Sequence, residues 1–226
     1  MLISMATINE TRISRLKARV VQHGMVQMNS KPYLAVLGRS NTGKSSLCRM
    51  LAPRAWKSIK VGKNPGSTKG LIQVENEDYT LVDLPGFGFM MHVSRKFRDE
   101  TQDKIISFIE EKHKQIFLAI EVINIEMFRI AFDKYKDISV PFDKELFEFL
   151  LQFNVPVIVL ANKIDKLRKQ EAEAEFTYLQ TALDLKSQPG FPEDNVMRFS
   201  AKTGLGFDTV KERIANYLAS FLQKSE

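Results

Sequence analysis

Hydrophobic positions along the chain fall into two patterns, short continuous runs and longer runs with the spacing of one helix face. The continuous runs predict strands at residues 33–37, 71–74, 79–82, 116–123, 155–160 and 196–199. The spaced runs predict helices at residues 44–51, 96–111, 142–153, 168–184 and 207–222. Strands that are apolar throughout, such as PVIVLA at 156–161, are typical of a sheet covered by helices on both faces.

The order of these elements predicts an α/β fold with a doubly wound sheet. The tripeptide NED at 76–78 makes a tight turn between the second and third predicted strands, so these two strands are expected to pair as a hairpin. The sheet is therefore predicted to have six strands, mostly parallel, with one antiparallel edge strand. A chain of 226 residues is long enough for one such domain, which we place at residues 31–226.

The first predicted strand leads directly into GRSNTGKSS at residues 38–46, which has the G-x-x-x-x-G-K-S spacing of a phosphate-binding P-loop. Gly38 and Gly43 let backbone N–H groups curve around a phosphate without a Cβ clash. Lys44 brings a positive charge to the terminal phosphates, and Ser45 offers a hydroxyl ligand for Mg²⁺. The strand before the motif and the helix after it are the context that a P-loop requires.

The strand PVIVLA is followed by Asn162, Lys163, Ile164 and Asp165. A carboxylate at the end of a strand can accept two hydrogen bonds from guanine, whereas adenine presents an acceptor at the same place. Charge-assisted bonds contribute about 1.5–3 kcal/mol each, so Asp165 is expected to select GTP over ATP. A surface salt bridge is the alternative for this aspartate considered alone.

Two further loops belong to the same predicted edge of the sheet. Asp83 follows the third strand and is expected to hold Mg²⁺ through a water molecule, while the amide of Gly86 is placed to sense the γ-phosphate. Thr68, in the preceding loop, is the expected second hydroxyl ligand of Mg²⁺, with Ser67 as its competitor. Ser200-Ala201-Lys202 follows the last strand, where a backbone N–H can meet guanine O6.

These motifs define the expected site. The Mg²⁺ ligands are Ser45, Thr68 and Asp83, and the residues expected to assist hydrolysis are Asn41, Lys44, Thr68 and Gly86. The residues expected to contact the nucleotide are Gly38, Arg39, Ser40, Asn41, Thr42, Gly43, Lys44, Ser45, Ser46, Gly66, Ser67, Thr68, Asp83, Leu84, Pro85, Gly86, Asn162, Lys163, Ile164, Asp165, Ser200, Ala201 and Lys202. The five motifs occur in the order found in a Ras-like P-loop GTPase, so that fold is predicted.

The stretches GRSNTGKSS, PGST and DLPGFGF together resemble the EngB/YihA group of small GTPases, whose usual forms are close to GRSNVGKSS, PGxT and DLPGYGY. The resemblance covers most of the chain from about Lys31 to the C-terminal helix. It implies a GTP-dependent factor in assembly of the large ribosomal subunit that is also linked to cell division and septation. The chain departs from the group at Thr42, at Asn124 and in a longer segment at residues 125–141.

Hydrolysis poses a separate question, because Phe87 stands where Ras-type proteins carry a glutamine that orients the attacking water. Intrinsic hydrolysis is therefore expected to be slow. Asn41 matches an asparagine that helps to hold K⁺ against the phosphates in related GTPases, although a turn-stabilising role is an equal alternative. A rearrangement of the loop at 87–92 by a partner is the other route.

Charge is unevenly distributed along the chain. The net charge is +6, yet the stretch from Thr11 to Val74 contains thirteen Lys and Arg residues and no Asp or Glu. Residues 1–30 form a basic extension with one short predicted helix. With the family resemblance, rRNA phosphates are the expected partner of this basic third, whereas a solvated basic face is the alternative. The sole tryptophan, Trp56, could stack on a base or serve in packing.

Other features narrow the expected setting. The chain has one cysteine, no apolar run long enough to span a membrane and no secretory h-region, so we expect a cytoplasmic monomer. The expected activity is hydrolysis of GTP to GDP and phosphate with Mg²⁺, as a molecular switch in ribosome biogenesis. The alternative is a GTP-dependent binding module that recruits a protein partner, with hydrolysis only as a timer. The Phe-rich stretch at 142–153 is expected to pack mainly in the core, with a groove for a protein partner as the alternative for the rest of it.

Overall fold

The computed structural model describes residues 31–58, 71–86, 95–137, 141–188 and 191–224. The strands of its sheet run in the order β2-β3-β1-β4-β5-β6. They are β1 (Tyr33–Leu37), β2 (Ile72–Glu75), β3 (Thr80–Asp83), β4 (Ile116–Asn124), β5 (Val157–Asn162) and β6 (Val196–Arg198). Only the β2–β3 pair of this sheet is antiparallel, which confirms the predicted edge hairpin.

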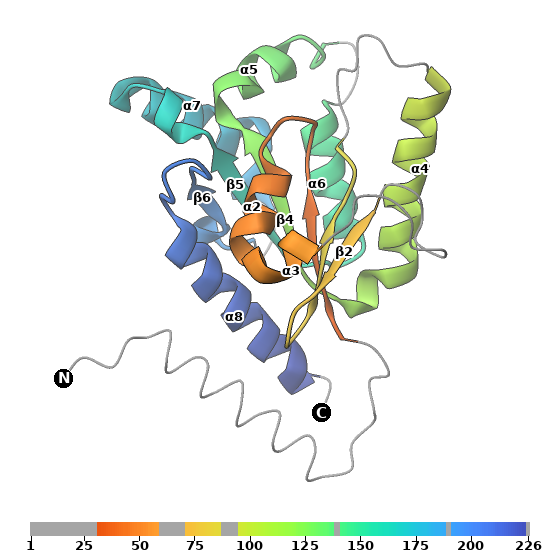
Figure 1. The fold of residues 1–226 in the computed structure, drawn as a ribbon. Helices are drawn as coiled ribbons and strands as arrows, with labels where there is room; N and C mark the ends of the chain where they lie inside the picture. The colour runs from red at the N-terminus through yellow and green to blue at the C-terminus, as the bar shows by residue number, and fades with distance from the viewer. Residues whose placement is uncertain (1–30, 59–70, 87–94, 138–140, 189–190, 225–226) are drawn as a thin grey trace, which may run out of the picture.

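Helices cover both faces of the sheet (Figure 1). One face carries α2 (Lys44–Leu51), α3 (Pro53–Ser58) and α8 (Phe207–Lys224). The other face carries α4 (Arg95–Lys112), α5 (Ile125–Asp133), α6 (Phe142–Gln152) and α7 (Lys169–Ala182). Short 3₁₀ helices lie at His113–Gln115, Ile164–Lys166, Leu185–Ser187 and Glu193–Asn195.

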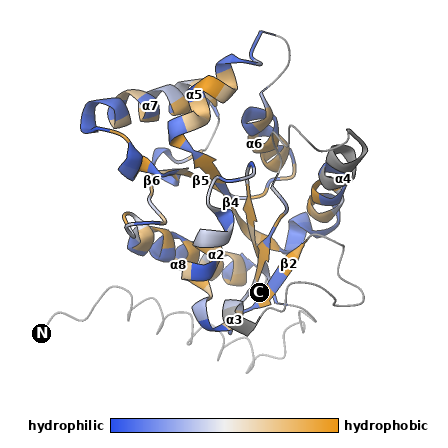
Figure 2. Ribbon diagram, turned by 45° about the horizontal axis from the view of Figure 1, so that its top comes forward, coloured by the Kyte–Doolittle hydropathy of each residue, from blue (hydrophilic) through white to orange (hydrophobic). Residues whose placement is uncertain are grey.

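Two hydrophobic cores result, one on each face. Strand side chains alternate between them, so that on β4 Ile120 and Val122 face α2 and α8, whereas Ala119 and Ile123 face the opposite helices. Figure 2 shows that the central strands are mostly hydrophobic, whereas the helices carry both hydrophobic and hydrophilic residues. This is the pattern expected of a sheet that is buried on both sides.

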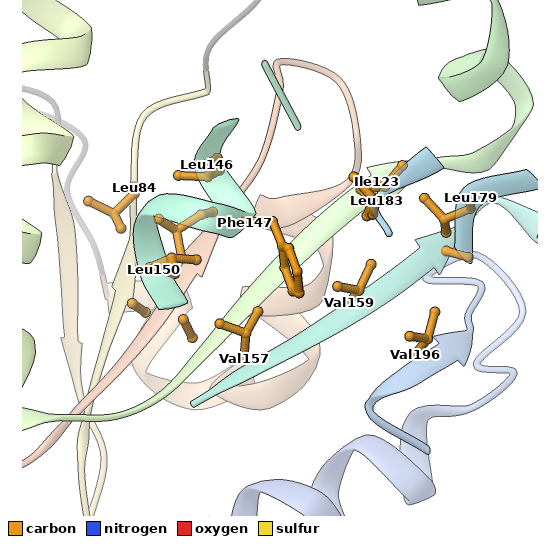
Figure 3. Close-up of a cluster of buried hydrophobic side chains, with 14 of the residues drawn as sticks. Leu84, Ile123, Leu146, Phe147, Leu150, Val157, Val159, Leu179, Leu183 and Val196 are labelled. Carbon is orange, nitrogen blue, oxygen red and sulfur yellow. The ribbon is translucent and has the colours of Figure 1, made fainter. Parts of the chain in front are cut away.

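Helix α6 shows how the second core is filled (Figure 3). Phe147 and Leu150 are fully buried against β4 and β5. The other aromatic residues of the Phe-rich stretch, Phe142, Phe149 and Phe153, are partly buried and pack against the same core. Core packing, as expected from the sequence, therefore accounts for this helix.

The structure adds two helices that the hydrophobic pattern did not predict. Helix α3 has only six residues and begins at Pro53, a favoured first residue of a helix. Helix α5 buries Ile125, Phe128 and Phe132, whose spacing is helical, so its signal was present in the sequence. Both short helices begin with at most one residue between them and the preceding element, so their first residues could not be recognised in the hydrophobic pattern.

Two predicted boundaries also shift. Val155 donates its N–H to the carbonyl of Leu150, so it closes α6 and β5 begins later. Asp184 has φ 53°, a left-handed conformation that ends the helical segment before it. Among the described residues, no helix combines the length and apolar composition needed to cross a bilayer.

Candidate functional site

The loop between β1 and α2 has the backbone of a phosphate cradle. Gly43 precedes α2 with φ 107°, which a residue with a Cβ rarely adopts. Gly38 has φ 129°, and a Cβ there would collide with the carbonyl oxygen of Val122 on β4. The two glycines therefore allow this loop to curve tightly at the carboxyl edge of the sheet.

Lys44 lies inside this curve. Its Nζ donates a hydrogen bond to the carbonyl oxygen of Arg39 at 2.7 Å, and the Thr42 hydroxyl donates to the same oxygen at 2.9 Å. Burial lowers the pKa of Lys44, and the nearby carboxylate of Asp83 opposes that shift. The ammonium group is thus held over the loop by a single backbone oxygen.

Ser45 and Asp83 form the candidate metal site. The Ser45 hydroxyl donates to Asp83 Oδ2 at 2.8 Å, while Asp83 Oδ1 is buried and has no hydrogen-bond partner among the described residues. Burial raises the pKa of Asp83, and the hydrogen bond from Ser45 opposes that shift. An orphaned carboxylate oxygen beside a hydroxyl fits Mg²⁺, which binds through one or two carboxylates and keeps several waters.

Gly86 lies against the P-loop as the sequence predicts. The Ser40 hydroxyl donates to the Gly86 carbonyl at 3.1 Å. A Cβ at Gly86 would lie 2.6 Å from Lys44 Nζ and 2.9 Å from the Ser40 backbone, so the chain can approach this closely only at a glycine. The loops that follow β1 and β3 thus lie against each other at the carboxyl edge of the sheet.

The residues after β5 bind the P-loop directly. The buried side chain of Asn162 donates to the Thr42 carbonyl at 2.6 Å, and Lys163 Nζ donates to the Asn41 carbonyl at 2.6 Å. Lys163 itself has φ 67°, and burial lowers its pKa. These two bonds fix the P-loop relative to the candidate base-binding loop.

The loop after β6 completes the arrangement. The amide of Ala201 donates to Asn162 Oδ1 at 3.0 Å, and the buried Ser200 hydroxyl donates to Asp165 Oδ1 at 2.5 Å. Asp165 remains exposed. Four of the five predicted motifs therefore meet at one edge of the sheet, with the exposed carboxylate at one end and Lys44 at the other.

Comparison with known proteins shows which family has this chain's sequence and fold. A family model described as "50S ribosome-binding GTPase" matches residues 33–163. The "Probable GTP-binding protein EngB" of Methanopyrus kandleri is 36% identical over 194 residues, covering 81% of this chain and 92% of that protein. The protein of the same name from Desulfotalea psychrophila is 34% identical over 200 residues, covering 87% and 94%.

The chain belongs to the EngB family of GTP-binding proteins. A crystal structure of an EngB protein agrees, with a TM-score of 0.70 and 29% identity over 83% of this chain and 99% of that one. The elongation factor SelB of Methanococcus maripaludis, at 20% identity and a TM-score of 0.54, shares the fold alone. As a member of this GTPase family, the protein binds GTP and GDP and hydrolyses GTP.

Several expected site residues of this EngB-family chain lie outside the described residues. They are Gly66, Ser67 and Thr68, and Phe87, which stands in place of the water-orienting glutamine, lies outside them as well. Among the described ones, Ser46 and Lys202 are exposed, whereas Ile164 and Leu84 turn into the core. These last two hold their loops in place through packing.

The structure also brings together three ionisable residues whose proximity was not predicted from the sequence. Arg39 points away from the P-loop cradle, and its Nε forms an ion pair with Asp143 Oδ2 of α6 at 2.8 Å. Glu121 of β4 is fully buried nearby, and Arg39 and Asp143 both act electrostatically on it. We call Arg39, Glu121 and Asp143 the α6 cluster. Its signal in the sequence is a glutamate within the otherwise apolar run IFLAIEVI.

A cavity of about 390 Å³ lies between P-loop residues 39–42 and α5. Met127 and Ile130 of α5 line it, and they are 46% and 64% exposed. Helix α5 is itself held to α7, where Arg129 pairs with Glu175 at 2.8 Å and stacks over the Tyr178 ring at 4.0 Å. The first nine residues of the segment that departs from the family pattern, Ile125–Asp133, thus form a docked helix beside the P-loop.

The remaining candidates have structural explanations. Cys48 lies on the buried face of α2, and burial raises its pKa, so it behaves as a small core residue. Trp56 is half-buried and packs against the core under α8, which favours its packing role. Most of the predicted basic surface lies outside the described residues.

Proposed function

We propose that this EngB-family protein is a GTP-dependent switch in assembly of the large ribosomal subunit, with a link to cell division and septation. The observation that supports it most directly is the match of residues 33–163 to a family described as ribosome-binding GTPases. The acid-free stretch from Thr11 to Val74 suits contact with rRNA phosphates and makes binding salt-dependent.

The proposed site assigns each residue a task. Lys44 binds the terminal phosphates, and Ser45, Thr68 and Asp83 hold Mg²⁺, which supplies charge neutralisation on the phosphate oxygens. The amide of Gly86 meets the γ-phosphate, and Asp165 binds guanine. Phe87 cannot orient water by hydrogen bonding, so hydrolysis without a partner is slow.

The proposed base-binding task can be tested separately. Asp165→Asn keeps the size of the side chain and should retain its hydrogen bond from Ser200, so the fold is expected to survive. GTP should then lose its advantage over ATP by one to two orders of magnitude, because charge-assisted bonds of about 1.5–3 kcal/mol are weakened. Unchanged selectivity in calorimetric titrations with both nucleotides would remove this assignment.

Asn41 is the proposed K⁺ ligand. It is exposed, and its backbone is held in a left-handed conformation, φ 63°, by the bond that its carbonyl accepts from Lys163. Replacing K⁺ with Na⁺ should slow GTP hydrolysis if a monovalent cation binds there. Equal rates in both salts would leave Asn41 with a role in the turn only.

The ribosomal role is tested by co-sedimentation of the full chain with purified ribosomal subunits, in a non-hydrolysable GTP analogue and then in GDP, across a salt series. We expect binding to the large subunit that requires the GTP form and weakens steeply with salt. Absence of binding at low salt in both states would overturn the proposal.

A second function is supported by the surface of α5. Its exposed Met127 and Ile130 lie beside the P-loop, where a protein partner could respond to the bound nucleotide. In this case the protein recruits a partner in its GTP form and hydrolysis acts as a timer. The double variant Met127→Ser/Ile130→Ser would then abolish the cellular role while the variant still bound large subunits normally.

A further inference from the structure

The α6 cluster places three ionisable side chains in the interior of the protein. Arg39 and Asp143 form an ion pair at 2.8 Å, and Asp143 is only 2% exposed. Glu121 is 0% exposed, and neither of its carboxyl oxygens has a hydrogen-bond partner among the described residues. Buried charges are costly unless they are paired, so their presence calls for a reason.

The fold determines where each member lies. Glu121 sits between Leu37 of β1 and Val159 of β5, and strand alternation directs it toward the face that α6 covers. Asp143 is in the first turn of α6, where the helix dipole favours a negative charge. Phe147 and Leu150 anchor that helix on the sheet (Figure 3), and Asp143 lies at the start of the same helix, at ion-pair distance from Arg39.

The charges in the cluster do not balance if both acids ionise. Burial raises the pKa of Glu121 well above its usual range, the charge of Asp143 raises it further, and Arg39 opposes both. Burial also raises the pKa of Asp143, but Arg39 opposes this shift directly at ion-pair distance. The charged groups that act on Glu121 come from the P-loop and α6, since its neighbours on β1 and β5 are apolar. One cation, one anion and one neutral acid therefore fit the site.

Arg39 connects this cluster to the nucleotide site. Its carbonyl oxygen accepts the hydrogen bonds from Lys44 and Thr42, while its side chain is held by Asp143 on the other face of the sheet. Holding the side chain therefore also holds the backbone oxygen that positions the Lys44 ammonium. Without the ion pair to Asp143, the Arg39 side chain would no longer restrain the first residues of the P-loop.

We propose that Asp143 is a positioning residue for nucleotide binding, which holds the P-loop through Arg39, and that Glu121 is a neutral reserve acid able to replace it as counter-ion. The role concerns the nucleotide binding of the family and stands whether or not the ribosomal function does. It also makes α6, which follows the family-divergent segment, a determinant of nucleotide affinity.

The test is the affinity of the full chain for Mg²⁺·GDP, measured by calorimetry between pH 6 and 9 and expressed at each pH relative to the wild type. Asp143→Asn should weaken binding about tenfold at pH 6, a factor equal to 1.4 kcal/mol. The deficit should shrink as the pH rises and Glu121 loses its proton, because the Glu121 carboxylate then becomes the counter-ion of Arg39. In Asp143→Asn/Glu121→Gln the deficit should stay at about tenfold across the whole range.

Matched variants separate positioning from general damage. Glu121→Gln alone should change GDP affinity by less than twofold, because it replaces a neutral group with a neutral group. Glu145→Gln removes an exposed acid from the same helix turn and should have no effect. If Asp143→Asn does not fold, Arg39→Gln/Asp143→Asn leaves no orphaned charge and should still weaken GDP binding.

Three results would overturn the proposal. One is a folded Asp143→Asn variant with wild-type GDP affinity at pH 6. Another is an identical pH profile for Asp143→Asn and the double variant, which would remove Glu121 as the reserve acid. The third is a Glu121→Gln variant that binds GDP as weakly as Asp143→Asn, since the acid would then be needed in its charged form.

Discussion

Two groups of charged and polar residues flank the loop after β1, one on each face of the sheet. On the α2 face, Lys44, Ser45 and Asp83 lie at the ligand edge and bond to one another or to backbone oxygens. On the opposite face, the α6 cluster lies deeper, and both carboxyl oxygens of Glu121 lack partners among the described residues. The first group is explained by the phosphates that it is expected to bind. The two carboxyl side chains of the second group are not among the residues expected to contact the nucleotide, and their burial costs folding energy.

This difference shows that a binding loop has two kinds of support. Residues that contact the ligand must have fixed types and spacings, because phosphate, Mg²⁺ and guanine demand them. Residues that support the loop without contacting the ligand need only the right charge and the right position in the folded chain. Arg39 belongs to both groups, since its carbonyl faces one and its guanidinium the other.

The largest expected effect comes from removing the anchor of α6. Phe147→Ala deletes a fully buried ring under this helix and should lower the free energy of unfolding by about 3–5 kcal/mol. Because α6 also carries Asp143, GDP affinity should fall in the fraction that remains folded. Urea denaturation and calorimetry measure the two effects.

Phe117→Ala is the matched control on the other face. Phe117 is 1% exposed and packs against Tyr79 and Phe221, away from both charged groups. It should cost a similar free energy of unfolding, about 3–5 kcal/mol, and leave GDP affinity unchanged. If both variants lower GDP affinity equally, the affinity follows global stability, and the α6 face does not support nucleotide binding more than the opposite face does.

A second prediction concerns the pH dependence of stability. Because folding raises the pKa of Glu121 above its ordinary value of 4.5, the folded chain retains a proton that the unfolded chain releases. The free energy of unfolding of the wild type should therefore carry a penalty that grows as pH rises above about 4.5. In Glu121→Gln this penalty is absent.

The stability of Glu121→Gln relative to the wild type should thus increase with pH, with a limiting slope of about 1.4 kcal/mol per pH unit for one proton. Urea denaturation between pH 5 and 8 measures this difference. The exposed Glu145→Gln variant should parallel the wild type across the range. A difference that is flat in pH would mean that Glu121 is already ionised in the folded protein.

The same contrast explains how much could be predicted from the sequence. The order of strands and helices, the antiparallel edge and the meeting of four motifs follow from hydrophobic runs and from residue types that nucleotide chemistry requires. The α6 cluster could not be predicted, because Arg39 and Asp143 are far apart in the chain and meet only through tertiary packing. Helix α5 was missed because it begins directly at the end of β4, without an intervening turn.

The smallest effect is expected at α5, which borders the P-loop but belongs to neither charged group. Arg129 joins it to α7 through Glu175 and the Tyr178 ring, in a contact that is 41% exposed on the arginine side. Arg129→Ala should lower the free energy of unfolding by about 0.5–1 kcal/mol, the size of an exposed ion pair and cation–π contact. GDP affinity should stay within twofold of the wild type, since the α6 cluster is left intact.

Arg54→Ala removes an exposed arginine from α3 and serves as the control for the loss of surface charge. Urea denaturation and GDP titration of both variants, at low and at physiological salt, decide the result. Screening should reduce the Arg129 effect at the higher salt. A tenfold loss of GDP affinity in Arg129→Ala would instead show that α5 supports the P-loop. Helix α5 would then position the nucleotide site together with the α6 cluster.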